Sequence, residues 1–298
     1  MRRLLALVAG GLTLSACHPG NQEAKRLDRA CEAGETAACN QLAVRLQKGE
    51  YVLRDVGRAA TLFGRACDGG IGDGCASLGM LHQRGTGGVA RDSALAARLF
   101  QRGCARGGLD GCTRLGALHE GGLGMPRDVG RAATLFRQAC DGGQLPGCAR
   151  LGALHASGEG VAQDVARAAA LFQRSCAGKV PTGCLGLARL HLAGAGVPRD
   201  DSTAVSLFDQ ACDGEETAAC FQLGAVYEAG RHAPQNYDRA ARLYREACAD
   251  SHGEACARLA ALYTNGAGVD RDPKRAAELT RNACTFGYVD ACPQPKRS

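Results

Sequence analysis

The sequence contains no tryptophan, and aromatic residues make up only 4% of its 298 residues. Large aromatic side chains supply much of the buried area of an ordinary hydrophobic core. A single globular core would therefore be thin in a chain of this length. An architecture in which each segment packs only against its neighbours needs no such core, because modest layers of Leu, Ala and Phe suffice.

The chain also lacks a strong excess of charge of either sign. Lys and Arg number 36 against 30 Asp and Glu, and the balance is closer still without Arg2 and Arg3 of the N-terminal segment. So weak a positive charge argues against nucleic acid as a partner. We therefore expect no binding to nucleic acid.

The apolar run near the N-terminus, LLALVAGGLTL, is too short to cross a bilayer as a helix of the mature protein. After Arg2 and Arg3 it is typical of a secretory signal peptide. It ends in LSAC (Leu14 to Cys17), which resembles the lipobox of bacterial lipoproteins, where cleavage before the cysteine is followed by its acylation. We expect a signal peptide over 1–16, a lipid anchor at Cys17 and a tether over 17–21. The alternative is an ordinary signal peptide with a free cysteine beside its cleavage site.

Acylation would hold the protein on a membrane, because each buried methylene adds roughly 0.8 kcal/mol. In the lipoprotein sorting rule of enteric bacteria, an aspartate after the acylated cysteine retains the protein at the inner membrane. His18 stands at that position. The resemblance favours the outer membrane, with the chain facing the periplasm or the surface; without acylation the alternative is a secreted protein.

Cysteine is abundant, with 17 residues, and all except Cys17 fall into eight C-x₇-C pairs. Export would place them in an oxidising compartment, where disulfides form and persist. In the cytosol the same cysteines would more typically be buried thiols. A metal site would favour cysteine ligands with CxxC-type spacing. We expect eight disulfides: Cys31–Cys39, Cys67–Cys75, Cys104–Cys112, Cys140–Cys148, Cys176–Cys184, Cys212–Cys220, Cys248–Cys256 and Cys284–Cys292.

The geometry of a disulfide decides what this spacing means. Two residues eight positions apart on one helix are about 12 Å apart, whereas bridged Cα atoms lie roughly 4.4–6.8 Å apart. The chain must therefore reverse between the cysteines of each pair. The intervening segments agree, since DGGIGDG, DGGQLPG and their equivalents are rich in turn-forming residues. Each pair is predicted to close a corner between two helices.

The first cysteines of the pairs recur every 36 residues, with a single interval of 37, which is the period of a helical solenoid. In each repeat a first helix, helix A, follows the second cysteine, as in CTRLGALHEGG (Cys112 to Gly122). A glycine-rich corner then leads to helix B, as in RAATLFRQAC. A small residue such as Gly116 in helix A should let the partner helix approach closely.

An acidic or amide residue precedes each helix B and is placed to accept its first free amide groups. These predicted caps are Asp55, Asp92, Asp128, Asp164, Asp200, Asn236 and Asp272. Seven helix pairs result, preceded by a lone helix B around Gln22 to Cys31. The predicted fold is all-α, a right-handed α/α superhelical solenoid over 22–292 with a disordered tail over 293–298.

The motifs LGxLH/Y, GxGV, D and AAxLF/Y at this period resemble the Sel1-like repeat, a relative of the tetratricopeptide repeat. The cysteine pair in every unit resembles the cysteine-rich Hcp family of Helicobacter in particular. The resemblance covers Gln22 to Cys292. The sequence departs from the family pattern in three ways. His replaces Tyr at the end of four A helices, and Phe or Tyr replaces Trp in helix B. The segment RHAPQN (Arg231 to Asn236) lacks the GxG corner, which puts the geometry of that corner in doubt.

The resemblance implies two different functions. Sel1-like proteins are mostly scaffolds that hold protein or peptide partners, whereas the Hcp branch is described as penicillin-binding with weak β-lactamase activity. A β-lactam or a peptidoglycan-like compound would be the ligand in the second case.

Catalytic motifs are missing from the sequence. A serine β-lactamase needs S-x-x-K with partner motifs such as SDN and KTG, and none of these is present. Four histidines, His82, His119, His155 and His191, hold equivalent places in successive repeats, where helix spacing of about 8–10 Å keeps them from sharing one zinc ion. We expect them to replace Tyr, with their nitrogens bonded to backbone. We assign no catalytic residue, metal or cofactor, although a triad assembled in space stays open.

Helix A of tetratricopeptide-like repeats lines the concave side, so its non-core residues should face a groove. The candidates are Gln41, Arg114, Arg150, Arg189, Gln222 and Arg258. Arginine suits bidentate contact with carboxylates, so we expect a cationic groove for an acidic peptide or another carboxylate-bearing ligand. The alternative is that these are ordinary solvated helix faces.

Overall fold

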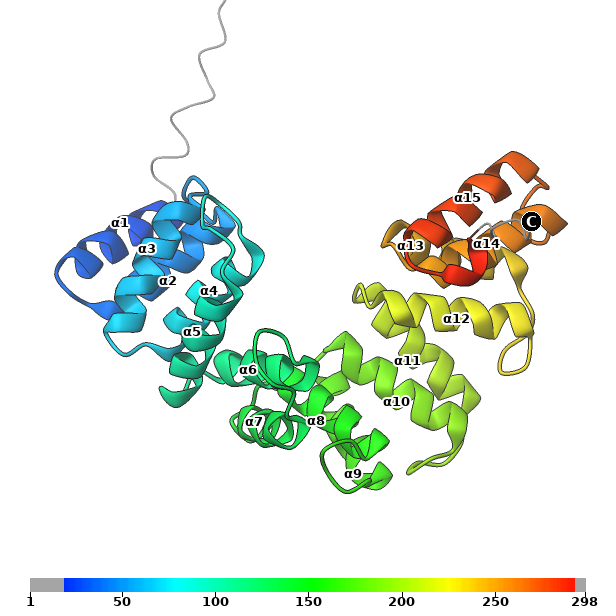
Figure 1. Cartoon of the computed structure of the whole chain (residues 1–298), viewed down its shortest axis with the longest axis horizontal. Coiled ribbons are helices and arrows are strands. Elements are labelled where there is room, and N and C mark those ends of the chain that lie inside the picture. Colours follow the sequence, from blue (N-terminus) through cyan, green and yellow to red (C-terminus); the bar gives the residue numbers. More distant parts are fainter. Residues whose placement is uncertain (1–18, 293–298) are drawn as a thin grey trace, which may run out of the picture. The chain divides into compact units, whose positions relative to one another are not determined.

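The computed structural model describes residues 19–292. The predicted signal peptide, Cys17 and the tail over 293–298 lie outside these residues and stay predictions. Within the described range every regular element is a helix (Figure 1). The helices are α1 (Pro19–Glu32), α2 (Thr36–Lys48), α3 (Val56–Asp68), α4 (Gly72–Arg84), α5 (Ser93–Ala105), α6 (Leu109–Gly121), α7 (Val129–Asp141), α8 (Leu145–Ser157), α9 (Val165–Ala177), α10 (Pro181–Ala193), α11 (Asp201–Asp213), α12 (Thr217–Ala229), α13 (Tyr237–Ala249), α14 (Gly253–Asn265), α15 (Pro273–Thr285) and the 3₁₀ helix η1 (Val289–Ala291).

The chain forms two compact units that divide between Gln144 and Leu145. The first unit contains α1 to α7, and the second contains α8 to α15 with η1. In both, even-numbered helices are A helices and odd-numbered helices are B helices, so α1 is the predicted lone helix B. The predicted α/α solenoid of seven helix pairs is confirmed.

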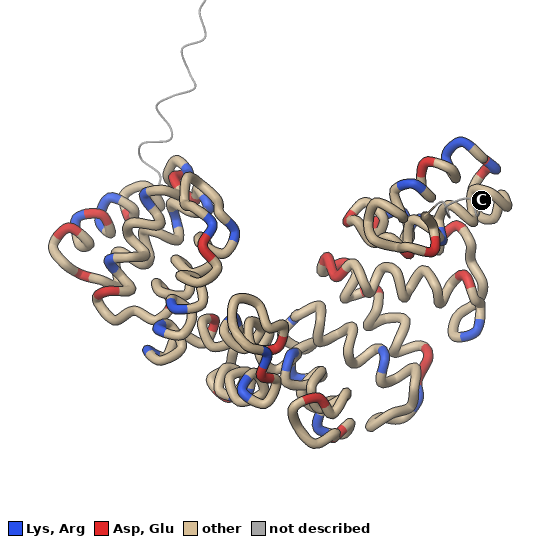
Figure 2. Tube along the Cα trace, in the orientation of Figure 1, with Lys and Arg blue, Asp and Glu red and all other residues tan. Residues whose placement is uncertain are grey.

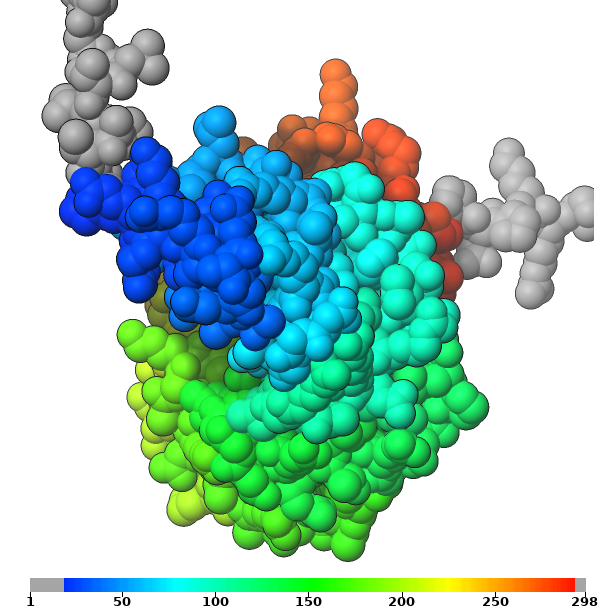
Figure 3. All heavy atoms as spheres, turned by 90° about the vertical axis from the view of Figure 1, so that its left-hand side faces the viewer, coloured from blue at the N-terminus to red at the C-terminus, as the bar shows by residue number. Residues whose placement is uncertain are grey.

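Helix α1 starts at Pro19, three residues before the predicted start of the solenoid. Residues 19–21, which fall in the predicted tether, are therefore helical. Proline is well suited to the first turn of a helix, because its fixed φ is already helical and its missing N–H would have no partner there. Figure 3 shows the side of the first unit on which α1, in dark blue, lies at the edge.

The seven predicted caps all start B helices. Asp128 is representative: its Oδ1 accepts a hydrogen bond from the Arg131 amide at 2.9 Å, and each of the other six accepts from an amide near the start of its own helix. Removing such a cap typically costs about 1 kcal/mol. These residues therefore set where each B helix begins.

Close approach of the two helices in a pair depends on a small residue in helix A. A Cβ atom added to Gly116 of α6 would lie 2.6 Å from the ring of Phe136 of α7, and one added to Gly224 of α12 would lie 2.7 Å from Tyr244 of α13. Both rings are fully buried. The ring of helix B thus occupies the space that a side chain on helix A would need.

Disulfides join the B helix of one repeat to the A helix of the next. The structure contains Cys31–Cys39, Cys67–Cys75, Cys104–Cys112, Cys176–Cys184, Cys212–Cys220, Cys248–Cys256 and Cys284–Cys292. Their Cα atoms are 4.5 to 4.8 Å apart. Cys140 and Cys148 are also disulfide-bonded.

No helix between residues 19 and 292 has both the length and the apolar character needed to cross a membrane.

Candidate functional site

A groove of about 370 Å³ lies over α12 in the second unit. The A helices α10, α12 and α14 contribute most of its lining, and the corner after α12 closes one end. The lining residues are Leu192, Phe208, Phe221, Gln222, Ala225, Val226, Ala229, Arg231, His232, Glu254 and Arg258. The groove is thus on the helix-A face, where the sequence predicts a partner site.

The floor of this groove is apolar. Leu192, Phe221 and Ala225 are partly buried and leave part of their surface open. The Phe221 ring stacks on the ring of His252, with centroids 4.5 Å apart. His252 Nδ1 in turn accepts the Ala255 amide at 3.2 Å and caps α14. No sequence signal pointed to this capping role, because histidine is not a usual cap.

Three predicted groove residues lie together along the rim. Arg189 of α10 donates from Nε to Oε1 of Gln222 on α12 at 3.1 Å. Arg258 of α14 forms ion pairs with Glu228 of α12 at 3.5 Å and with Glu254 at 3.7 Å. Consecutive A helices therefore bring Arg189, Gln222 and Arg258 to one surface.

Glu228 is held in place by a second contact. The Tyr244 hydroxyl donates to Glu228 Oε2 at 2.6 Å. Burial and this carboxylate raise the pKa of Tyr244 above its ordinary value, so the hydroxyl stays protonated as a donor at neutral pH. Glu228 is consequently a fixed partner of Arg258, and the charge of that arginine is balanced within the chain.

The corner after α12 differs from the others, as its sequence suggested. Five of the other corners place a glycine with positive φ two residues after the helix C-cap, such as Gly160 and Gly196, but His232 stands there without a positive φ. Its Nδ1 lies 3.1 Å from Oδ2 of Asp201, and Arg199 also contacts both residues. His232 therefore has an acidic partner in the chain.

The charge state of Asp201 at this corner follows from its contacts with Arg199 and His232. The hydrogen bond from Arg199, and after it the one from His232, lowers the pKa of Asp201 below its ordinary value. The carboxylate is thus ionised at neutral pH and joins two successive corners.

The other predicted groove residues are not part of this groove. Arg150 is exposed on α8, also in the second unit. Gln41 on α2 and Arg114 on α6 belong to the first unit, where Arg114 pairs with Asp110 at 2.7 Å. Figure 2 shows acidic and basic residues interspersed along the chain. At this groove Arg258 is paired with two glutamates, whereas Arg189 bonds to the neutral Gln222; the cationic groove stays a prediction.

Three of the four equivalent histidines bond to backbone as predicted. His82, His155 and His191 place Nδ1 at 3.1 Å, 3.3 Å and 3.1 Å from carbonyl oxygens of the following corner. His119 differs, because its Nδ1 is buried and has no hydrogen-bond partner among residues 19–292. The rings of His82, His155 and His191 thus join helix A to its corner.

One cluster in the described chain has the composition of a metal site. Ligand atoms of Cys212, Cys220 and Glu246 lie within 4.8 Å of one another. The two sulfurs are bonded to each other at 2.04 Å, so neither is a thiolate that could bind a metal.

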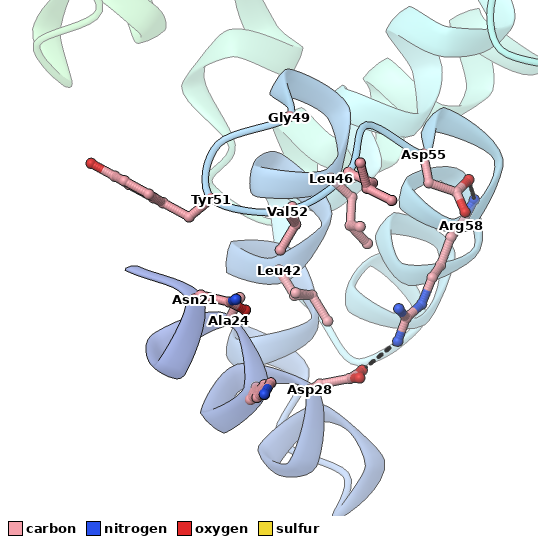
Figure 4. Close-up of a pocket in the computed structure, with 12 residues that line it drawn as sticks. Asn21, Ala24, Asp28, Leu42, Leu46, Gly49, Tyr51, Val52, Asp55 and Arg58 are labelled. Atoms are coloured by element: carbon pink, nitrogen blue, oxygen red, sulfur yellow. Dashed lines mark hydrogen bonds and ion pairs between the residues drawn. The ribbon is translucent and has the colours of Figure 1, made fainter. Parts of the chain in front are cut away.

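A second pocket, of about 760 Å³, lies in the first unit between α1, α2 and α3 (Figure 4). Leu42, Leu46 and Val52 contribute apolar surface, and the ion pair between Asp28 and Arg58, at 2.6 Å, crosses one side. The corner that joins α2 to α3 forms the rest of the wall.

Comparison with known proteins gives the family. The Sel1 repeat model matches seven consecutive segments: 36–71, 72–108, 109–144, 145–179, 181–215, 217–252 and 253–285. A search of curated proteins found no match.

Solved structures with the same repeat are similar to this chain. The protective antigen c5321 of uropathogenic Escherichia coli is 27% identical with a TM-score of 0.62; the match covers 90% of this chain and 57% of that one, so this chain spans little more than half of its relative. A Sel1 repeat protein of Oxalobacter formigenes is 24% identical, with a TM-score of 0.66 and coverage of 90% and 77%. Cysteine-rich protein B of Helicobacter pylori is 25% identical over 44% of this chain and 93% of that one, with a TM-score of 0.36.

Sel1 repeat proteins generally mediate protein–protein interactions. With seven matched repeats over most of its length, the chain belongs to the Sel1 repeat family.

Proposed function

We propose that this protein is a non-catalytic scaffold that binds an extended segment of a partner protein in the groove over α12. The observation that carries the proposal is the combination of an open apolar floor with hydrogen-bonding side chains on the rim. Binding sites with this composition orient a ligand through a few polar groups while apolar contact supplies affinity.

The groove suits a particular kind of segment. An apolar side chain would rest on Leu192, Phe221 and Ala225, and a neighbouring carboxylate would face Arg258 and the exposed Arg231. Because Arg258 is already paired with two glutamates, a partner carboxylate would have to share it. Charge would therefore select the partner more than it would tighten binding.

The proposed location is the bacterial envelope. Disulfides persist in oxidising compartments outside the cytoplasm, and the lipobox-like LSAC supports a lipid anchor at Cys17. The E. coli relative is a protective antigen, which supports an exported protein. We propose a lipid-anchored scaffold at the outer membrane, facing the periplasm or the cell surface.

The groove can be tested by filling its floor. Ala225→Tyr adds a ring on the open side of α12 and should block the groove, while Ala117→Tyr makes the same change at the equivalent position of α6. Photocrosslinking in cells from Gln222, with identification of the captured protein, supplies a partner whose affinity can then be measured.

We expect Ala225→Tyr to weaken binding at least about tenfold, the effect of losing roughly 1.4 kcal/mol of contact, and Ala117→Tyr to bind as the wild type does. Equal affinities for the two variants would rule out this groove as the binding site.

A further inference from the structure

The corner that joins α2 to α3, residues 49–55, departs from the other corners at neighbouring positions. Tyr51 stands where five other corners have a glycine with positive φ, and Leu53 stands where the others have Pro, Ala or Asp. Leu46, at the end of α2, replaces the His or Tyr of the other A helices. All three changes make this corner more apolar.

Tyr51 keeps the backbone conformation of the glycine that it replaces. Its φ is 61°, a region that strains a residue with a side chain. The glycines of three other corners lie against a larger residue of the preceding B helix: a Cβ on Gly87 would come 2.2 Å from the side chain of Val56, and one on Gly196 or Gly268 would meet Val165 or Tyr237. In the corner after α2 the large and the small residue are exchanged: the corner residue is Tyr51, and its neighbour on the preceding B helix, α1, is Gly20. A Cβ on Gly20 would lie 2.3 Å from the Tyr51 ring.

The exchange directs apolar surface outward. Tyr51 is 56% exposed and Leu53 is 91% exposed, two of the six large hydrophobic side chains exposed in the described chain. Tyr51 and Leu53 belong to the wall of the pocket together with Leu42 and Val52, and Figure 4 shows the Tyr51 ring extending outward from the corner. Leu46 has no ring nitrogen, so the histidine-to-corner hydrogen bond of other repeats, as in His191 to Pro198, has no equivalent here.

The position of this corner points to what covers it. The Tyr51 ring contacts the first turn of α1, which begins at Pro19. Two residues span at most about 7 Å, so the predicted acylated Cys17 can lie no farther than that from the start of α1. Exposed charges of both signs flank the corner, with Lys48 paired to Glu50 at 3.3 Å and Lys25 and Arg54 nearby, so the proximity of the anchor and the exposed apolar side chains, rather than net charge, point to a lipid surface.

We propose that the corner 49–55 rests on the lipid surface to which the chain is anchored, with Tyr51 and Leu53 entering the boundary between headgroups and acyl chains. Tyrosine suits this depth, because its ring is apolar and its hydroxyl can reach water. The contact acts as a second attachment beside the lipid and orients the first unit on the membrane. The proposal rests on the proposed lipid anchor.

The absence of tryptophan from the chain permits a clean test. In Tyr51→Trp the single tryptophan reports on this corner alone, and Tyr237→Trp, at the start of α13, serves as the matched control. The full mature protein is bound to phosphatidylethanolamine–phosphatidylglycerol vesicles with brominated acyl chains. Leu53→Trp provides a second probe at a side chain that makes little contact with the fold, and circular dichroism checks folding.

We expect the emission of Tyr51→Trp and of Leu53→Trp to shift to shorter wavelength and to be quenched by the bromine atoms, while the emission of Tyr237→Trp does neither. Adding Leu53→Asp to Tyr51→Trp should remove the shift. Emission from the two corner variants that matches the Tyr237→Trp control overturns the proposal, as does a shift that grows with protein concentration without vesicles, which would indicate a second copy of the chain.

Mass spectrometry of the N-terminus separates this proposal from the anchor. An acylated Tyr51→Trp protein whose tryptophan stays exposed to water overturns the corner contact alone. A protein without lipid whose introduced tryptophan still inserts supports the corner contact and removes the anchor. A protein that carries no lipid and whose introduced tryptophan also stays exposed to water overturns both the anchor and the corner contact.

Discussion

At the scale of single residues, one backbone position recurs in every C-x₇-C corner. It lies three residues after the first cysteine, and its φ is between 59° and 98° in all eight corners. The residues are Gly34, Gly70, Gly107, Gly143, Lys179, Glu215, Ser251 and Gly287. A side chain in this left-handed region costs roughly 1–2 kcal/mol, so the three corners without glycine are strained.

Glu215→Gly should relieve this strain. Glycine loses more conformational freedom on folding, by about 0.5–1 kcal/mol, so we expect a net gain of about 0.5–1 kcal/mol in the free energy of unfolding of the second unit. Urea denaturation measures this gain. Glu215→Ala keeps the strain and is the control; equal stability of the Gly and Ala variants would contradict the explanation.

The equivalent histidines differ in whether the ring Nδ1 has a hydrogen-bond partner. His191 Nδ1 bonds to the Pro198 carbonyl at 3.1 Å, whereas His119 Nδ1 is buried and finds no partner within residues 19–292. Leu46 shows that an apolar side chain fits at the same place in a repeat, where it is 5% exposed.

We therefore expect opposite effects of one substitution at two sites. His191→Leu should lower the free energy of unfolding by about 1 kcal/mol, because a hydrogen bond is lost, and His119→Leu should leave it unchanged or raise it by up to about 1 kcal/mol. Thermal unfolding of both variants gives the comparison. A similar loss at both sites would show that ring packing, rather than hydrogen bonding, decides stability here.

At the scale of elements, the helices and their limits could be predicted because their signals are local. The caps Asp55 to Asp272 act within one turn, and cysteine spacing requires a chain reversal. Contacts between successive corners could not be predicted in the same way. His232 meets Asp201 because a residue in one repeat lies over the start of the preceding B helix, and the partner is 31 positions away in the sequence.

Each disulfide should stabilise its own corner. A loop of nine residues gains roughly 2.6 kcal/mol from closure in the chain-entropy account. We expect the double variant Cys176→Ala, Cys184→Ala to lose about 2–3 kcal/mol of stability in α9 and α10, measured by hydrogen exchange of their amides. Exchange in α14, farther along the same unit, serves as the internal reference; unchanged protection of α9 and α10 would show that packing alone holds this corner.

At the scale of the whole molecule, the period of 36 residues predicts both the fold and the family, because every repeat carries the same pattern. The candidate groove was predicted only in part. Arg189, Gln222 and Arg258 do come together, but the glutamates that balance Arg258 lie one turn away on α14 and across on α12. Their role depends on how neighbouring A helices pack, which no local pattern encodes.

The Hcp resemblance raised β-lactam hydrolysis as the alternative function. We expect the purified mature protein to show no turnover of a chromogenic cephalosporin above the rate in buffer, because the chain lacks S-x-x-K, SDN and KTG. Turnover that survives repurification and is lost on substitution of a single histidine or arginine would contradict the scaffold proposal.

The bridges described above join each cysteine to one only eight positions further along. Sixteen cysteines could combine in on the order of two million ways. A chain that crosses a membrane from its N-terminus, however, delivers the correct mate as the next thiol to emerge. On the proposed export route, with Cys17 occupied by the lipid, we therefore expect a fast oxidant working on the emerging polypeptide to produce the native pattern without correction by an isomerase.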